Sequence, residues 1–395
     1  MPFSTKTSLE NDVPMQGAGF YNANSDLQAA AMRHVLPLLD TIAKDTACNP
    51  FTVVEYGCAQ GANSILPIKR ILEARFPLQN HISHQASETT NGNGESNTSE
   101  NTSQEILLTF SDRAGNDFNT LVETISNADW LSHFDTSSSD RNAPAILTSM
   151  AAGTFYSRLV PRESVDVGFS LATLHHLDRW PANASPAAEA DVLHEQTRPQ
   201  AHADLVHFLT LRGQEFRRGG SLVLSFVSRS SMGVPNYPSL VDSCRQAMIA
   251  MIFEGRVDPA VAGSFLVPTH DRTIQEVKDS LATVSGLWDV EGLFEEEVTH
   301  PAYARFQETS NDQPDSANRA GSISEWYAET VVDWMMAVIS GYFIKALRTG
   351  APGLSPEQQQ GLVDDWRNRT KEVFLKEYKD ERVACWFVYV KLRRV

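Results

Sequence analysis

The chain has 395 residues, of which 42% are hydrophobic and 21% charged, and it carries a formal net charge of −16. These values are typical of a globular protein with one large core or two smaller ones, and the acidic balance disfavours nucleic acid and anionic membranes as partners. We find no continuous apolar stretch of the length, about 18 residues or more, that predicts a transmembrane helix.

Strand and helix patterns alternate along much of the chain. The predicted strands cover residues 51–57, 106–112, 145–150, 165–171, 221–227, 288–298 and 384–392, and the predicted helices cover residues 27–43, 64–76, 119–127 and 200–216. Such alternation implies crossover connections and a parallel α/β sheet. The last two strands are expected to form an antiparallel pair at its edge.

A low-complexity segment interrupts this pattern. Residues 83–104 are dominated by Asn, Ser, Thr, Gly and Glu, which cannot bury enough apolar surface to fold. We predict a disordered surface insertion there. The triplets at Asn97 and Asn101 match a glycosylation acceptor, but without a signal peptide a plain surface loop is the preferred interpretation.

Residues 231–283 and 301–380 are mostly helical by pattern and rich in aromatic residues and methionines. Examples are Trp326, Tyr327, Trp334, Met335, Met336, Tyr342 and Phe343. The composition predicts a helical subdomain core, and some of these side chains would line a pocket if the helices cap the ligand edge of the sheet. Residues 284–300 and 381–395 would add the final strands to a core formed by residues 1–230.

Cysteine usage bears on the compartment. Cys48, Cys58, Cys244 and Cys385 show no paired spacing, so neither a disulfide framework nor a zinc site is indicated. The N-terminal residues are polar and lack the apolar core of a secretory signal. We therefore expect a cytoplasmic protein.

The first predicted strand ends in Glu55-Tyr56-Gly57-Cys58-Ala59-Gln60-Gly61 and leads into a helical pattern. The two glycines allow a sharp turn and a close approach of the backbone to a ligand, because a Cβ atom would block both. Three residues separate them. This spacing differs from the Gly-x-Gly-x-x-Gly of dinucleotide sites, and it favours S-adenosylmethionine as the ligand.

Other strand ends agree with this prediction. Ligands of open α/β sheets bind beyond the carboxyl ends of the strands. The second strand ends at Asp112, whose carboxylate can accept hydrogen bonds from two ribose hydroxyls. The third leads to Phe155, whose ring could stack on an adenine, and the fourth leads to His175 and His176. Four strand ends that agree are stronger evidence than the glycines alone.

Five segments carry motifs found together in one protein family. They are residues 15–28, 55–64, 111–121, 153–161 and 170–181, with a weaker match over residues 204–220. The most specific parts are Asn116-Asp117-Phe118-Asn119 and residues 153–161. The chain resembles the plant-type SABATH methyltransferases, which methylate carboxyl groups and ring nitrogens with S-adenosylmethionine and release S-adenosylhomocysteine. The resemblance implies a class I methyltransferase fold, in which a Rossmann-like, seven-stranded, mostly parallel sheet carries a helical cap.

The resemblance also implies roles for individual residues. Gln28, His175 and His176 would face the carboxylate of the acceptor. The residues expected to bind S-adenosylmethionine are Tyr21, Ser25, Glu55, Gly57, Cys58, Gly61, Asn63, Asp112, Arg113, Thr154, Phe155 and Ser170. We expect Asn116, Asp117 and Asn119 to form a turn and a helix cap rather than to bind the ligand.

His176 departs from the family pattern, which usually has tryptophan there. Histidine keeps a ring N–H donor but loses most of the flat apolar surface, which favours a small polar acid, with one or two carboxyl groups, over an aromatic one. The candidates for a cation that would bind a second acid group are Arg229, Arg272, Arg305 and Arg348. Residues 263–266 lack the magnesium-associated motif of some family members, so no metal is expected there.

Together these observations predict an enzyme that forms methyl esters of a small carboxylic acid by direct in-line transfer. Such an acid is ionised at pH 7, because its pKa is about 4, and it needs no general base. Two alternatives stay open. One is transfer to a nitrogen or a phenol hydroxyl with His175 or His176 as the base, and the other is a non-catalytic regulator that binds the cofactor or a small acid. The resemblance also leaves a homodimer open.

Overall fold

A seven-stranded sheet forms the centre of the computed structural model, which describes residues 13, 15–42, 48–76, 104–128, 144–186, 188–312 and 317–395. The strand order is β3-β2-β1-β4-β5-β7-β6. The parallel strands are β1 (Phe51–Tyr56), β2 (Glu105–Asp112), β3 (Ala145–Ala152), β4 (Val165–Leu171) and β5 (Phe216–Val227). Strand β7 (Ala384–Arg394) pairs antiparallel with both β5 and β6 (Trp288–Thr299).

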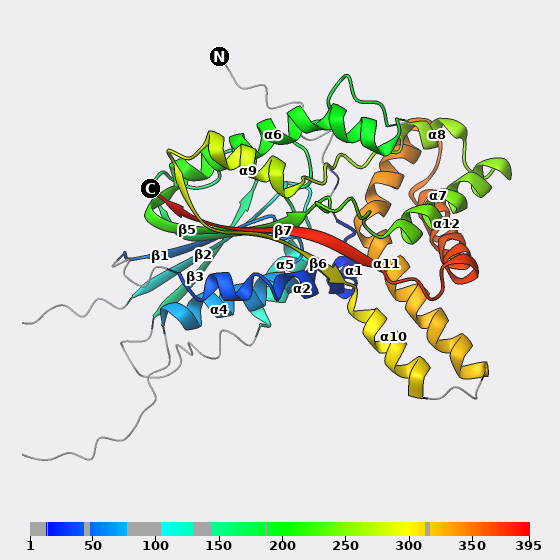
Figure 1. Cartoon of the computed structure of the whole chain (residues 1–395), viewed down its shortest axis with the longest axis horizontal. Helices are drawn as coiled ribbons and strands as arrows, with labels where there is room; N and C mark the ends of the chain where they lie inside the picture. Colours follow the sequence, from blue (N-terminus) through cyan, green and yellow to red (C-terminus); the bar gives the residue numbers. More distant parts are fainter. Residues whose placement is uncertain are drawn as a thin grey trace, which may run out of the picture.

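Helices cover both faces of the sheet (Figure 1). One face carries α2 (Asp26–Met32), α4 (Ile65–Arg75) and α5 (Phe118–Ser126), and the other carries α6 (Ala190–Glu215) and α9 (Ile274–Thr283). Every residue of β1 is buried. Because side chains alternate along a strand, Val53 joins the core under the first face while Val54 and Tyr56 join the core under the second.

The remaining large helices gather beyond the carboxyl ends of the parallel strands (Figure 1). They are α7 (Pro238–Phe253), α8 (Pro259–Ser264), α10 (Pro301–Asp312), α11 (Ala317–Gly350) and α12 (Pro356–Glu377). Trp366 of α12 is buried among them, and its indole N–H donates to the carbonyl of Cys244 over 2.9 Å. We call this group of helices the cap. It closes the edge of the sheet at which a ligand of this fold class binds.

Helix α11 is long and apolar enough over Ser322–Gly350 to cross a membrane, with a mean hydropathy of 1.3. In this fold it is the central helix of the cap. Its side chains Tyr327, Met336 and Phe343 are buried, and Asp333 forms an ion pair with Arg367 of α12. The interior of the cap therefore accounts for the apolar character of this segment.

The structure confirms the predicted parallel α/β sheet and the antiparallel pair at its edge, in which β6 is the outer strand and β7 the inner one. The single helix predicted over residues 27–43 is wrong. Among the residues described, α2 and α3 (Leu36–Leu39) replace it, because Pro37 favours a new helix start over continuation. The short helix α1 (Phe20–Ala23) precedes them, and η2 (Ala62–Ser64), a single 3₁₀ turn, precedes α4.

Two other boundaries differ from prediction. Helix α6 begins at Ala190 rather than near residue 200, because it continues through the exposed Pro199 and is held by buried Leu205, Phe208 and Leu209. Helix α9 falls in the range predicted as cap, but it packs beside α6 over the sheet. The predicted insertion lies outside the described residues except for its last residue, and so do the triplets at Asn97 and Asn101.

Candidate active site

A cavity lies at the carboxyl ends of the strands, beside the point where the strand order switches between β1 and β4. The cap and the N-terminal segment form its other walls. Twelve of the fifteen predicted site residues line it, namely Tyr21, Gln28, Glu55, Gly57, Cys58, Gly61, Asn63, Asp112, Arg113, Phe155, His175 and His176. The structure thus brings together residues that the sequence spreads from position 21 to position 176.

The turn after β1 depends on both of its glycines. Gly57 has φ 91° and Gly61 has φ 87°, in the region that other residues rarely adopt. A Cβ atom on Gly57 would lie 2.6 Å from the side chain of Thr173, and one on Gly61 would lie 2.6 Å from Leu121. The amides of Gly57 and Cys58 both donate to the carbonyl of Ser111, which fixes the turn beside β2.

Asp112 joins this turn to the end of β2. Its carboxylate accepts from the backbone amides of Ala59 and Arg113, each over 2.7 Å. Asn116 holds the same turn from the other side, since its amide donates to the carbonyl of Ala59 over 2.7 Å. Asp117 caps α5 by accepting from the amide of Thr120. The predicted turn at Asn116 and helix cap at Asp117 are both present, but Asn116 also lines the cavity.

Glu55 offers the cavity an acceptor without a partner. The side chain is buried, and its Oε2 makes no hydrogen bond with any described residue. Burial, reinforced by the charge of Asp112, raises the pKa of this carboxyl to about 8, although a hydrogen bond from Ser64 opposes the shift. A buried acceptor of this kind suits a cationic ligand group, and S-adenosylmethionine carries an ammonium group that fits it. Burial also raises the pKa of the neighbouring Cys58 thiol well above its usual value, so Cys58 is not a reactive thiolate.

The N-terminal segment is hydrogen-bonded over the glycine turn. Asn22 donates to the carbonyl of Gln60 over 3.1 Å and accepts from the amide of Ala62 over 3.3 Å. Gln60 donates in turn to the carbonyl of Gln16 over 2.8 Å. These bonds bring Tyr21 to the cavity. The sequence did not single out Asn22, because an asparagine in a short helix has no distinctive pattern.

Gln28 and Trp334 meet across the cavity from opposite parts of the chain. The indole N–H of Trp334 donates to Oε1 of Gln28 over 2.9 Å. An indole can only donate, so this contact fixes which end of the amide is oxygen. The NH₂ group of Gln28 is therefore its remaining donor for a ligand.

His175 and His176 lie side by side, with ring centroids 4.3 Å apart. Burial, helped by the positive charge of Arg113, lowers the pKa of His176 to about 3. Burial also lowers the pKa of His175 well below its usual value, and the neighbouring His176 adds to the shift. Both rings are therefore neutral at pH 7. The ring of Tyr342 faces His176 almost in parallel, at 14° and 6.4 Å.

Three predicted residues do not line the cavity. Ser170 donates to the carbonyl of Tyr56 over 2.7 Å, and Ser25 accepts from the Asn63 amide over 3.1 Å. Thr154 accepts from the amide of Tyr156 over 3.2 Å. Ser25 thus supports Asn63 of the wall, and Ser170 also contacts the hydroxyl of Thr173 in the wall over 2.6 Å. For Ser170, closeness to a strand end did not decide whether the side chain faces the ligand, because strand side chains alternate in direction.

Four residues line the cavity that sequence reasoning did not single out, namely Tyr237, Asp271, Val338 and Ile339. Trp334, Met335 and Tyr342, which the sequence offered as candidates for a pocket, line it as well. Burial raises the pKa of Asp271, which accepts from Asn236 over 3.1 Å. The aromatic-rich helix α11 therefore contributes both to the pocket lining and to the core of the cap, where Tyr327 and Phe343 are buried.

The four arginines proposed as cations for a second acid group do not line the cavity. Arg229 pairs with Asp191, and Arg348 donates to Gln359. Arg305 lies over the ring of Trp326. Arg272 is buried elsewhere, where it donates to the carbonyls of Leu174 and Ala201. Among the described lining residues, Arg113 is the arginine at the cavity.

Comparison with known proteins decides the family. The sequence profile of the S-adenosylmethionine-dependent carboxyl methyltransferases matches residues 11–338. The chain belongs to this family. Methyltransferase LUC1 from Fusarium sp. is 41% identical to this chain over 397 residues. The alignment covers 98% of this chain and 99% of the relative.

More distant members agree. The salicylate/benzoate carboxyl methyltransferase of Arabidopsis thaliana is 26% identical over 282 residues, covering 67% of this chain and 68% of its own. The solved structure of a loganic acid methyltransferase with S-adenosylhomocysteine superimposes with a TM-score of 0.63 at 16% identity, over 96% of this chain and 98% of that one. The resemblance to the SABATH methyltransferases, the class I fold and the dependence on S-adenosylmethionine are confirmed.

Proposed function

We propose that this carboxyl methyltransferase family member forms the methyl ester of a small carboxylic acid by direct transfer. The observation that carries the proposal is a set of neutral hydrogen-bond donors that face the cavity. The amide of Gln28 and the rings of His175 and His176 face the cavity, and both rings are held neutral by burial. Neutral donors orient a carboxylate without removing the charge that makes it a nucleophile.

Each wall of the cavity has a part in this proposal. S-adenosylmethionine supplies an electrophilic methyl group when bound, and Glu55, the glycine turn, Asp112 and Phe155 would hold it. Gln28 would donate its N–H to the acceptor carboxylate, and His176 a ring N–H. The cap excludes water, which strengthens these hydrogen bonds. Alignment of the acceptor oxygen with the methyl group is then the main contribution of the protein to the rate.

Apolar side chains contribute much of the cavity lining, among them Val227, Val267, Met335, Val338, Ile339 and Phe387, and polar groups are added by Thr173, Ser225, Tyr237, Thr269 and Asp271. We therefore propose an acid with one carboxyl group and an apolar body. This replaces the expectation of a polar or dicarboxylic substrate, because none of the four candidate arginines reaches the cavity. The 26% identical relative named for salicylate and benzoate supports an acceptor of this kind.

Transfer to a nitrogen or a phenol is less favoured. A phenol must lose its proton at pH 7, and a general base works best when its pKa lies near the working pH. With a pKa of about 3, His176 is unprotonated but accepts a proton weakly. His175 has the same disadvantage.

The pH dependence of the rate tests the proposal. The assay uses a panel of mono- and dicarboxylic acids with labelled cofactor at saturation, and mass spectrometry identifies the esters. We expect the enzyme to methylate an apolar monoacid at a rate that does not change from about pH 6 to 9. The acid has a pKa of about 4 and is fully ionised in that range. His176 does not titrate there, and saturating cofactor removes any effect of Glu55 on cofactor binding. A rate that rises about tenfold per pH unit would instead indicate a phenol or nitrogen acceptor. No turnover with any acid would support a regulator.

Replacing Gln28 tests its proposed contact. We expect Gln28→Ala to lower kcat/KM by about 10- to 150-fold, the equivalent of a hydrogen bond to a charged group worth about 1.5–3 kcal/mol. Cofactor affinity should stay within about twofold, which calorimetry would measure. Trp334→Phe should lower the rate less, because it removes only the donor that orients Gln28. Gln360→Ala, on the exposed surface of α12, is the control. Equal losses of rate and cofactor affinity in Gln28→Ala would show that this residue is structural.

A further inference from the structure

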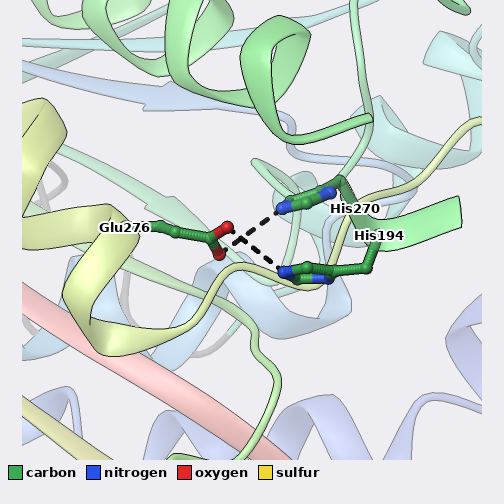
Figure 2. A group of neighbouring side chains, drawn as sticks. All are labelled: His194, His270 and Glu276. Atoms are coloured by element: carbon green, nitrogen blue, oxygen red, sulfur yellow. Dashed lines mark hydrogen bonds and ion pairs between the residues drawn. The ribbon is translucent and has the colours of Figure 1, made fainter. Parts of the chain in front are cut away.

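A second group of ligand-type side chains lies outside the active site, between the two helices that cover one face of the sheet. His194 comes from α6, Glu276 from α9, and His270 from the segment that leads into α9 (Figure 2). His194 Nε2 lies 3.1 Å from Glu276 Oε1, and His270 Nε2 lies 3.5 Å from Glu276 Oε2. One ligand atom from each of the three lies within 4.8 Å of the others.

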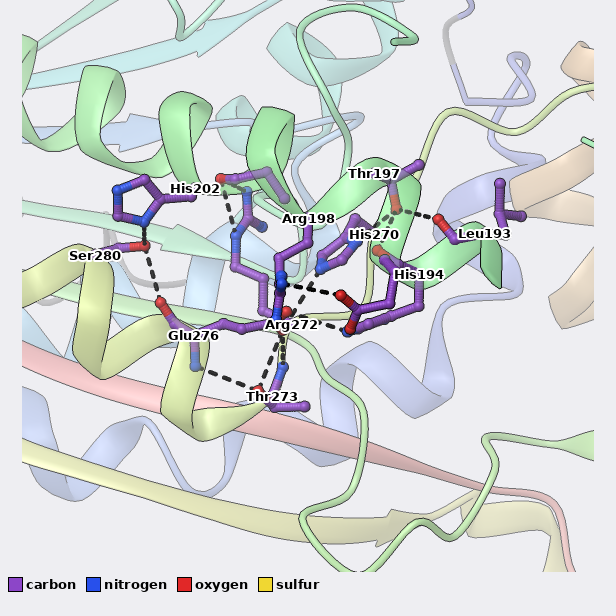
Figure 3. A network of polar contacts seen from close by, with 12 residues as sticks. Leu193, His194, Thr197, Arg198, His202, His270, Arg272, Thr273, Glu276 and Ser280 are labelled. Carbon is purple, nitrogen blue, oxygen red and sulfur yellow. Dashed lines mark hydrogen bonds and ion pairs between the residues drawn. The ribbon is translucent and has the colours of Figure 1, made fainter. Parts of the chain in front are cut away.

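The hydrogen bonds around His270 decide where its proton is (Figure 3). The Thr197 hydroxyl donates its hydrogen to the carbonyl of Leu193 over 2.9 Å, as is usual for a threonine inside a helix. It therefore accepts from His270 Nδ1, 2.7 Å away. In the neutral ring Nε2 then carries a lone pair.

That lone pair points toward another acceptor. His270 is 3% exposed, and its Nε2 makes no hydrogen bond with the described residues. Its nearest charged atom is an oxygen of the Glu276 carboxylate. Two acceptors that face each other repel unless a proton or a metal ion lies between them. A metal ion at this position would satisfy both lone pairs.

The distances suit a metal ion. Two ligands at about 2.1 Å from a tetrahedral zinc ion lie about 3.4 Å apart. The two nitrogen-to-oxygen separations, 3.1 Å to Oε1 and 3.5 Å to Oε2 of Glu276, fall on either side of this value, so each histidine lies at ligand distance from one oxygen of the carboxylate. The bond from His270 Nδ1 to Thr197 is the outer contact that metal-binding histidines usually make. Glu276 is oriented as well, because its carboxylate accepts from the amide of Thr273 over 2.8 Å.

We propose that His194, His270 and Glu276 form a zinc site. A second cavity borders two of the ligands, His270 and Glu276, and a water molecule that enters from it would be the fourth ligand. The guanidinium of Arg272 is close and positive, so we expect weaker binding than at a site without a neighbouring cation.

The zinc ion would join α6 to the segment before α9. That segment also carries Thr269 and Asp271, which line the active-site cavity. Zinc would therefore stabilise one wall of the acceptor pocket while taking no part in methyl transfer. No pattern in the sequence indicated the site, because its three ligands follow no known metal-binding spacing.

Titration of the metal-free, tag-free protein tests the site. We expect calorimetry to give about one Zn²⁺ per chain, cobalt to give the strong visible absorption of a tetrahedral site, and zinc to raise the melting temperature. A wild-type protein that binds no zinc in stoichiometric amount overturns the proposal, whatever the variants do.

Variants assign the ligands. Glu276→Gln removes the anionic ligand but keeps the capping box at the start of α9, so the helix should persist. We expect Glu276→Gln and His270→Gln to lower zinc affinity by more than about 100-fold, and Thr197→Val by about 10- to 100-fold, as for other outer contacts. His202→Ala is the control, since His202 borders the same cavity but bonds to Ser280. Unchanged affinity in folded Glu276→Gln and His270→Gln proteins, checked by circular dichroism, would also refute the site.

Discussion

Arg212→Met is expected to lower the free energy of unfolding by about 3–5 kcal/mol, because it leaves the carboxylate of Glu215 buried without its counter-charge. Both side chains are fully buried, and Arg212 Nε lies 2.7 Å from Glu215 Oε2. The guanidinium also donates to the carbonyls of Phe155 and Ser157 over 2.9 and 2.8 Å. Glu215 accepts from the amide of Leu159 over 2.7 Å. The pair therefore holds the loop after β3, and with it Phe155.

Urea unfolding followed by circular dichroism measures this loss, and calorimetry with S-adenosylhomocysteine should show weaker binding of the product nucleoside. Arg198→Met is the matched control. Arg198 lies on the same helix with the same three-residue spacing to its partner Glu195, but both side chains are more than half exposed. Such a pair contributes at most about 1 kcal/mol. A loss below about 1 kcal/mol in Arg212→Met would mean that the loop does not depend on this pair.

Asp112→Ala is expected to weaken the binding of S-adenosylhomocysteine by about 1–3 kcal/mol, or about 5- to 150-fold in Kd. The carboxylate is fixed by the amides of Ala59 and Arg113, and it lines the cavity at the end of β2. In the proposed complex this carboxylate would accept from the ribose hydroxyls. Asp112→Asn keeps one acceptor oxygen and should lose less affinity.

Calorimetry at constant pH gives the affinities. Glu105→Ala is the control, because Glu105 is exposed at the opposite end of the same strand. Asn116→Ala separates binding from loop order, since Asn116 holds the same turn through the carbonyl of Ala59. If Asn116→Ala lost as much affinity as Asp112→Ala, order in the glycine turn would explain both results. An unchanged Kd in Asp112→Ala would remove its ribose role.

The sheet and one wall of the site could be predicted because both follow from local patterns. Apolar runs marked the strands, and each strand end placed its next residues at the same edge of the sheet. Gly57 and Gly61 stand between a predicted strand and a predicted helix, where the chain must turn sharply. Their positive φ values make this turn possible.

The acceptor wall could not be predicted in the same way. Gln28 meets Trp334 only because α11 crosses the edge of the sheet, and no local pattern gives that crossing. Tyr237 reaches the cavity from the loop between β5 and α7, and Asp271 from the segment between α8 and α9. The arginine candidates were wrong for the same reason, since each found a partner set by tertiary packing. Prediction was also limited on the sheet itself. For Ser170, the sequence indicated a position near a strand end but not the direction of the side chain.

The position of β7 has a consequence for how the protein is made. Residues 384–394 lie between β5 and β6, and Cys385 and Phe387 of this strand line the cavity. During synthesis the ribosome would add them after nearly all the other strands have emerged. The parallel half of the sheet can assemble beforehand, but the binding site cannot close until this strand is inserted. A translation product truncated before residue 384 should therefore expose two unpaired strand edges and be subject to aggregation or proteolysis.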